Sequence, residues 1–295
     1  MSTTKRRGKS KSILEFEQAI LQIVEERAPI TVRGVAYALF TRGLIDSMVI
    51  NNTSKVSRVM TEMRECGALD WTKIVDGSRA TDRISVWSNP SEIIEAAVRG
   101  YRRNYWQDQP TLIEVWSEKS TVAGLLAPVL TEFGVTFRVQ KGFGSFTSVR
   151  RAAEDSLGVP DHQNPIALYI GDYDPSGMYM SEIDLPERLE RYGSRWQFQR
   201  IAVLKSDTPH LPSFEASTKS GDNRYPWFVE NFGHKCWELD AIDPNDLRKR
   251  VREQIVTRLN LLAWEHAKRI EEVEVESMQS FHHAWTTRLQ GAQHG

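Results

Sequence analysis

Features that mark secreted, membrane-bound or zinc-binding proteins are scarce in this sequence. Its 295 residues include only two cysteines, Cys66 and Cys236, which lie far apart and have no metal-ligand residues beside them. We expect both to be reduced thiols, which excludes a disulfide scaffold and a zinc ribbon. No apolar run approaches the length of a membrane span, and no signal-peptide pattern opens the chain. These absences favour a cytoplasmic protein that has no membrane partner.

A strong charge of either sign is also missing, since the formal net charge is −1. Basic side chains are nevertheless concentrated near the start of the chain, at Lys5, Arg6, Arg7, Lys9 and Lys11. Residues 1–12 are therefore predicted to form a flexible basic tail, which either contacts phosphates or is simply solvated. The length suits two domains rather than one, and the hydrophobic fraction of 40% is enough to give each a core.

The most informative segment is residues 166–177. An apolar run over residues 166–170 predicts a buried strand, and Asp172 and Asp174 follow it two positions apart. Alternate residues of a strand point to one face, so both carboxylates are expected on the same side. At the carboxyl end of a parallel strand, paired carboxylates form an oxygen-rich site suited to Mg²⁺. The alternative is a polar β-turn, which Asp, Pro, Ser and Gly also favour.

A third carboxylate follows an earlier strand. Residues 112–118 predict that strand, with Glu118 at its carboxyl end, and residues 119–133 predict an amphipathic helix. A later helix is expected over residues 178–192, with Ser176 as its N-cap. This alternation predicts an α/β domain whose mostly parallel sheet is flanked by helices, with Glu118 and the Asp pair at one edge. Taken alone, Glu118 is equally well explained as a carboxylate that complements a helix dipole.

The front of the chain, residues 13–88, predicts an α+β winged-helix domain. The expected elements are helices over residues 13–27, 32–40 and 51–66 and two short wing strands at 71–75 and 84–87. The third helix offers Lys55, Arg58 and Arg64, and the wing offers Arg79, as candidate contacts to a DNA duplex. A winged helix that binds proteins instead of DNA is the alternative.

The second of these helices carries Arg33 and Tyr37. Thr31 is its expected N-cap, and the two residues are four apart, so they share one helix face. On its own, a buried tyrosine in a small helical domain is ordinarily a core residue with a bonded hydroxyl. In the first helix, Leu14 and Ile20 are expected to face inward.

These motifs resemble a known family. A Glu after one strand and Gly-Asp-x-Asp-Pro-Ser-Gly after a later one are similar to the Toprim domain of topoisomerases, bacterial primases and several nucleases. A winged helix with Arg-x-x-x-Tyr ahead of that domain resembles the A subunit of type VI DNA topoisomerase. It also resembles the related transesterase that makes meiotic double-strand breaks. Similar stretches at residues 59–67 and 236–247 extend the likeness over about residues 14–260, in the manner of a compact prokaryotic or mobile-element relative.

The resemblance implies roles for five residues. Tyr37 would be the nucleophile that attacks a DNA phosphodiester, and Arg33 would support the phosphate. Glu118 would act as general acid or base and as a metal ligand, and Asp172 and Asp174 would bind Mg²⁺, or Mn²⁺ in its place. The resemblance also implies double-stranded DNA as substrate, a homodimer in which the tyrosine of one protomer meets the metal site of the other, and a separate ATPase subunit. In a bacterium the protein would be nucleoid-associated.

Three functions remain in competition at this point. The first is a DNA-cleaving transesterase, the second is a metal-dependent Toprim endonuclease that uses water, with Tyr37 structural, and the third is a non-catalytic DNA-binding or assembly factor. The predicted organisation is a basic tail (1–12), a winged-helix domain (13–88), a connector (89–108), a Toprim domain with an extension (109–262) and a C-terminal helical segment (263–295).

Overall fold

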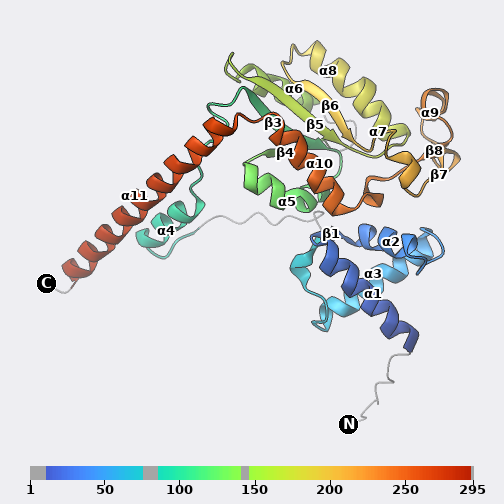
Figure 1. Ribbon diagram of the computed structural model, residues 1–295, viewed down its shortest axis with the longest axis horizontal. Helices are drawn as coiled ribbons and strands as arrows, with labels where there is room; N and C mark the ends of the chain where they lie inside the picture. The colour runs from blue at the N-terminus through green and yellow to red at the C-terminus, as the bar shows by residue number, and fades with distance from the viewer. Residues whose placement is uncertain (1–10, 76–85, 141–145, 294–295) are drawn as a thin grey trace, which may run out of the picture.

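The computed structural model describes residues 11–75, 86–140 and 146–293, and the side chains of the last helix as far as residue 287. Three parts are visible in Figure 1: a helical front domain, a larger domain built on a parallel sheet, and an arm formed by a long C-terminal helix and a short partner. Most of the predicted basic tail, and Arg79 with the turn of the predicted wing, lie outside the described residues.

Three helices form the front domain: α1 (Lys11–Arg27), α2 (Val32–Thr41) and α3 (Ile50–Glu65). They enclose a core that includes Ile20, Ile23, Val35, Leu39, Val56 and Met60. Thr31 caps α2 as predicted, because its side chain accepts a hydrogen bond from the amide of Gly34 at 2.9 Å. The inward position predicted for Leu14 is wrong, since this side chain is 52% exposed, near the start of α1 and ahead of the part that packs on the other helices.

The predicted wing is only partly described. Residues Trp71–Lys73 form a 3₁₀ turn, and β2 (Ile74–Val75) pairs in parallel with β1 (Ile30–Thr31), which precedes α2. A strand was expected over residues 71–75, so only its last two residues are strand, and their partner is β1. The winged form of this domain therefore stays a prediction, while its three helices are confirmed.

The second domain is built on a four-stranded sheet in which all strands are parallel. Its order is β4-β3-β5-β6, formed by Thr136–Val139, Thr111–Ser117, Asn164–Ile170 and Gln197–Ala202. β3 and β5 are neighbours with Ser117 opposite Ile170, so their carboxyl ends meet. This confirms the predicted mixed α/β class with a parallel sheet, an arrangement compatible with a Toprim-like core.

Helices cover both faces of this sheet (Figure 1). On one face lie α5 (Thr121–Phe133) and α10 (Pro244–Val256), and on the other α6 (Phe146–Leu157) and α8 (Leu185–Arg191). The strands are apolar towards both layers because parallel strands of this kind are buried on both sides. Ile113 and Val115 of β3 face the first layer, and Trp116 faces the second.

The helix after the Asp pair begins earlier than predicted. α7 (Pro175–Tyr179) leads through a π-helical turn (Met180–Asp184) into α8, and its N-cap is Asp174 rather than Ser176. The Asp174 carboxylate accepts from the Gly177 amide at 2.7 Å. A Cβ atom at Gly177 would lie 2.3 Å from the carbonyl oxygen of Asp172, so this tight turn requires glycine.

The segment between β6 and α10 contains a small hairpin. β7 (Phe214–Glu215) pairs antiparallel with β8 (Lys235–Cys236), and between them lie the 3₁₀ turn η4 (Ala216–Lys219) and α9 (Tyr225–Phe232). A further 3₁₀ turn, η5 (Leu239–Ala241), follows β8. Cys66 and Cys236 are both free, as expected from their separation.

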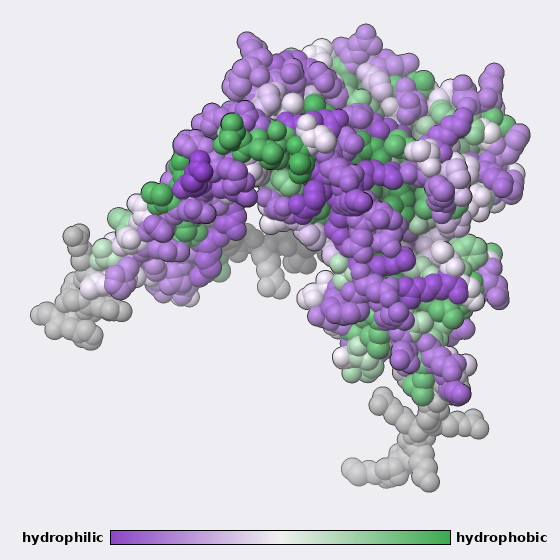
Figure 2. Space-filling view, in the orientation of Figure 1, coloured by the Kyte–Doolittle hydropathy of each residue, from purple (hydrophilic) through white to green (hydrophobic). Residues whose placement is uncertain are grey.

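The arm consists of α4 (Pro90–Gly100) and α11 (Leu261–Gln293). The predicted connector and the predicted C-terminal segment therefore pack on each other, and the Tyr101 hydroxyl donates to Glu274 at 2.6 Å. Figure 2 shows hydrophobic residues gathered over the start of α11, where Leu261 and Leu262 are 57% and 85% exposed. No described helix is both long and apolar enough to cross a membrane.

Candidate active site at the sheet edge

The three predicted carboxylates come together where β3 and β5 end. Glu118 directly follows β3, and Asp172 and Asp174 follow β5, at the edge where these neighbouring strands finish. Burial, and then the negative charges of Asp172 and Asp174, raise the pKa of Glu118. The strand order therefore places the three carboxylates at the same edge of the sheet.

Two lysines, which the sequence analysis did not single out, neutralise part of this charge. Lys119 Nζ lies 2.9 Å from Asp172 Oδ1, and Lys219 forms an ion pair with Asp174. Asp172 Oδ1 also accepts from the Leu239 amide at 2.8 Å. Burial raises the pKa of Asp172 even though Lys119 acts in the opposite direction. The charges of this edge are thus arranged as paired acids and ammonium groups.

The carboxylates at this edge are of the kind that binds a divalent cation, and in the structure their negative charges are balanced by Lys119 and Lys219. Among the residues that the structure describes, no three His, Cys, Asp or Glu side chains are grouped as a ready-made metal site. The Glu118 carboxylate, however, has no hydrogen-bond or ion-pair partner among those residues, and it lies beside the charges of Asp172 and Asp174. Carboxylate oxygens are the ligands that Mg²⁺ prefers. A cation bound here would take over the role of the ammonium groups.

Arg33 and Tyr37 of α2 face the same region of the molecule. The Nε and Nη2 groups of Arg33 donate to the two carboxylate oxygens of Glu238, which makes a bidentate pair. Tyr37 is only 5% exposed. Burial, and then the negative charge of Glu238, raise the pKa of Tyr37.

The segment around η5 connects α2 to the sheet edge. Asp240 Oδ1 accepts from the Thr31 hydroxyl at 2.9 Å, and its Oδ2 lies 2.9 Å from Lys119 Nζ. Since Lys119 also pairs with Asp172, a continuous series of polar contacts runs from the start of α2 to the carboxylates. Glu238 and Asp240 lie in the stretch noted only for its family resemblance, and their Glu-x-Asp spacing was the one available signal.

Arg248 of α10 fixes the front domain onto the sheet domain. Its guanidinium donates to the carbonyls of Arg27 and Ala28 at 3.0 and 3.3 Å, and to that of Leu125 in α5 at 3.0 Å. The front domain therefore lies against α5 and α10 of its own chain, below the sheet in Figure 1. The resemblance implies that Tyr37 works with the metal site of another protomer, whereas the structure places it beside Glu238 of the same chain.

A pocket of about 410 Å³ opens beside these groups. Arg33, Tyr37 and Glu238 form its polar part, and apolar side chains such as Phe40 and Phe214 form the rest. A phosphate that entered this pocket would meet the guanidinium and the phenol hydroxyl together.

The predicted DNA contacts are in different situations. Lys55 and Arg58 are exposed on α3. Arg64 is half-buried, with its guanidinium 4.7 Å from the ring centre of Trp71, and by helical geometry it lies on the side of α3 opposite Lys55. The three residues were expected to contact DNA together, but they do not lie on one face of α3. Arg79 lies outside the described residues.

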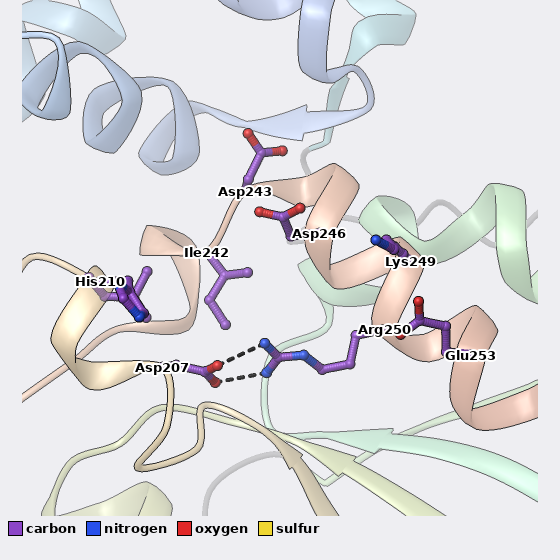
Figure 3. A pocket seen from close by; sticks show the side chains of 9 residues that line it. Asp207, His210, Ile242, Asp243, Asp246, Lys249, Arg250 and Glu253 are labelled. Carbon is purple, nitrogen blue, oxygen red and sulfur yellow. Dashed lines mark hydrogen bonds and ion pairs between the residues drawn. The ribbon is translucent and has the colours of Figure 1, made fainter.

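A second hollow lies beside α10, and Figure 3 shows its lining. Asp207 and Arg250 face each other there through two hydrogen bonds of 2.7 Å. Asp243, Asp246 and Glu253 add carboxylates to the lining. This excess of negative charge disfavours the binding of a phosphate in this hollow.

No family model, curated protein or solved structure matches the chain.

Proposed function

We propose that this protein is a DNA-cleaving transesterase of the type VI topoisomerase A-subunit kind. The observation that carries the proposal is the series of contacts that joins the Arg33 and Tyr37 helix to the carboxylates at the sheet edge. A nucleophile, a guanidinium and an acidic, cation-binding edge are the parts that phosphoryl transfer to a tyrosine requires.

In the proposed reaction Tyr37 Oη attacks the phosphorus of a DNA phosphodiester. Arg33 neutralises the non-bridging oxygens, for which the phosphate must displace Glu238 from the guanidinium. Mg²⁺ held by Glu118, Asp172 and Asp174 would stabilise the charge that develops on the phosphoryl group. Glu118, at the carboxyl end of β3, is the candidate to protonate the leaving oxygen and to take the proton back on religation. By resemblance, the tyrosyl link would be to the 5′ end.

The proposed substrate is double-stranded DNA, bound through Lys55 and Arg58 on one side of α3, with Arg79 and the basic tail as further candidates and a smaller part for Arg64, which stacks on Trp71. One tyrosine cuts one strand, so a double-strand break requires two copies, and a two-fold homodimer is the simplest assembly that supplies them. A separate ATPase subunit and a cytoplasmic, nucleoid-associated location belong to the same proposal.

A metal-dependent nuclease that uses water is the second candidate. The burial of Tyr37 and its raised pKa favour it, because a buried phenol that holds its proton is a poor nucleophile unless a base removes that proton. In this case Tyr37 would be structural, and the carboxylate edge alone would carry the chemistry.

A denaturing gel separates the candidates. Labelled duplex is incubated with the wild-type protein and Mg²⁺ or Mn²⁺, and label that stays with the protein after denaturation reports a covalent adduct. We expect Tyr37→Phe to abolish the adduct while duplex binding persists, and Asp172→Asn or Asp174→Asn to abolish metal-dependent cleavage. Undiminished cleavage by Tyr37→Phe would establish the water-using nuclease. Neither adduct nor cleavage from the wild type would leave a non-catalytic DNA-binding factor.

A further inference from the structure

Glu238 lines the same pocket as Arg33 and Tyr37, but it has no chemical role in the reaction proposed above. Both of its carboxylate oxygens are held by Arg33, whose guanidinium carbon lies 5.9 Å from the ring centre of Tyr37. All three residues line the same pocket, and the Glu238 side chain is 15% exposed. A carboxylate fixed by a bidentate guanidinium beside a phenol is held in an orientation suited to proton transfer.

The other nearby carboxylates are engaged elsewhere. Asp240 uses one oxygen for Thr31 and the other for Lys119, and Asp172 lies on the far side of that lysine. Arg33 and Tyr37 of α2 line the pocket together with Glu238, and Lys219 of η4 is a further cation whose pKa the charge of Glu238 helps to raise.

We propose that Glu238 is the general base that removes the proton of Tyr37 during DNA cleavage. The inference rests on the proposed transesterase function. In the step, the bond from Tyr37 Oη to phosphorus forms, the phenolic proton moves to a Glu238 oxygen, and the bond from phosphorus to the 3′ oxygen breaks. The 3′ oxygen takes its proton from Glu118 or from water, so no further reactant is needed.

Proton transfer would also release Arg33. A protonated Glu238 no longer carries the charge that holds the guanidinium, so Arg33 becomes available to the non-bridging phosphate oxygens as negative charge grows there. Deprotonation of the nucleophile and charge stabilisation at the phosphate would therefore occur together.

The first test compares Glu238→Gln and Glu238→Asp with the wild type by the rate of covalent adduct formation on labelled duplex with Mg²⁺. We expect Glu238→Gln to slow the reaction by about 10²- to 10⁴-fold, the usual contribution of a general base, with duplex affinity retained. Glu238→Asp should recover part of the rate. The matched control is Glu230→Gln, on an exposed residue of α9, which should react like the wild type.

The second test uses a readout that a merely structural role would not change. 3-Fluorotyrosine at position 37 is more acidic than tyrosine, so it depends less on a base, and it should restore part of the rate lost in Glu238→Gln. A Glu238→Gln protein that cleaves as fast as the wild type, or faster, would overturn the proposal and show that Glu238 only blocks Arg33. A slow, folded Glu238→Gln protein that fluorotyrosine does not rescue would also overturn it. A wild-type protein that forms no adduct would instead refute the transesterase function itself.

Discussion

Asp240 is the residue through which α2 and the sheet edge are joined, and Asp240→Asn should weaken that junction measurably. The Asp240 side chain is 9% exposed and accepts from the Thr31 hydroxyl and from Lys119, both at 2.9 Å. An asparagine keeps the shape and retains an oxygen for Thr31, but it removes the charge that Lys119 faces. It also places an amide NH₂ group where acceptors are few.

The expected loss of stability depends on which contacts Lys119 keeps after the substitution. Removing one partner of a buried ion pair costs about 3–5 kcal/mol when the other charge is left alone. Lys119 keeps Asp172, so the loss should be closer to that of one charge-assisted hydrogen bond. We therefore expect Asp240→Asn to lower the free energy of unfolding by about 2–3 kcal/mol at pH 7. The control Asp161→Asn, on a fully exposed carboxylate, should change it by less than about 0.5 kcal/mol.

The stability difference between the wild type and Asp240→Asn should also change with pH in a definite direction. Burial disfavours the charge of Asp240, but Lys119 and Thr31 outweigh it and lower the pKa of Asp240 below its ordinary value. Its contribution to stability is therefore complete above the unfolded-state pKa of about 3.9 and is lost as the pH falls through the lower folded-state pKa. Urea denaturation followed by circular dichroism should show a difference between wild type and Asp240→Asn that is constant from about pH 7 to 5 and shrinks below about pH 4. A difference under about 1 kcal/mol at pH 7, or one that grows on acidification, would refute this account of the junction.

Two further predictions concern other parts of the molecule. Arg250 donates twice to Asp207 and, against the effect of burial, lowers the pKa of Asp207. Asp207→Asn should therefore lower the free energy of unfolding by about 1–3 kcal/mol at pH 7 and by progressively less below about pH 4, as thermal unfolding across that range would show. Duplex affinity should also fall steeply with salt. The double variant Lys55→Ala, Arg58→Ala should reduce the slope of log K against log salt by about 0.9 for each phosphate that is no longer neutralised. Arg64→Ala should change this slope less, because the Arg64 guanidinium stacks on Trp71, and equal effects from all three substitutions would argue against the division of α3 into two faces.

Local patterns were sufficient to predict much of the sheet domain. The apolar spacing within residues 119–133 predicted an amphipathic helix, and Val122, Leu126 and Val129 of α5 are buried. Gly134 ends this helix with a φ of 57°, the left-handed conformation that glycine adopts without strain. These features depend on residues within one or two turns of each other, so the sequence displays them directly.

The N-cap of α7 shows where local reasoning is insufficient. Asp174 and Ser176 are both good caps, and the choice between them depends on which side chain reaches the Gly177 amide. Asp174 does, so one oxygen of a predicted metal ligand is fixed by the helix that follows. The wing illustrates a similar limit, because β2 pairs with β1, which lies ahead of α2 and α3 in the chain, rather than with a neighbouring segment.

The counter-charges of the candidate site could not be predicted from the sequence at all. Lys119 and Asp240 are 121 residues apart, and Arg33 and Glu238 are 205 residues apart. No periodicity relates such positions. The Lys119–Asp240 pair forms when distant segments of the sheet domain meet, and the Arg33–Glu238 pair forms when the front domain packs against that domain. The sequence could therefore supply the carboxylates and the tyrosine but not the charges that hold them in place.

The order of charges along this junction has a consequence for how the site would load a cation. Lys119 stands between Asp172 and Asp240, with 2.9 Å to each. A cation that displaced Lys119 from Asp172 would leave its contact with Asp240 in place, and Asp240 would still hold Thr31 at the start of α2. Binding of a cation at Asp172 and docking of α2 through Asp240 therefore depend on different carboxylates. If a cation replaced Lys119 at Asp172, the helix that carries Tyr37 would therefore stay docked.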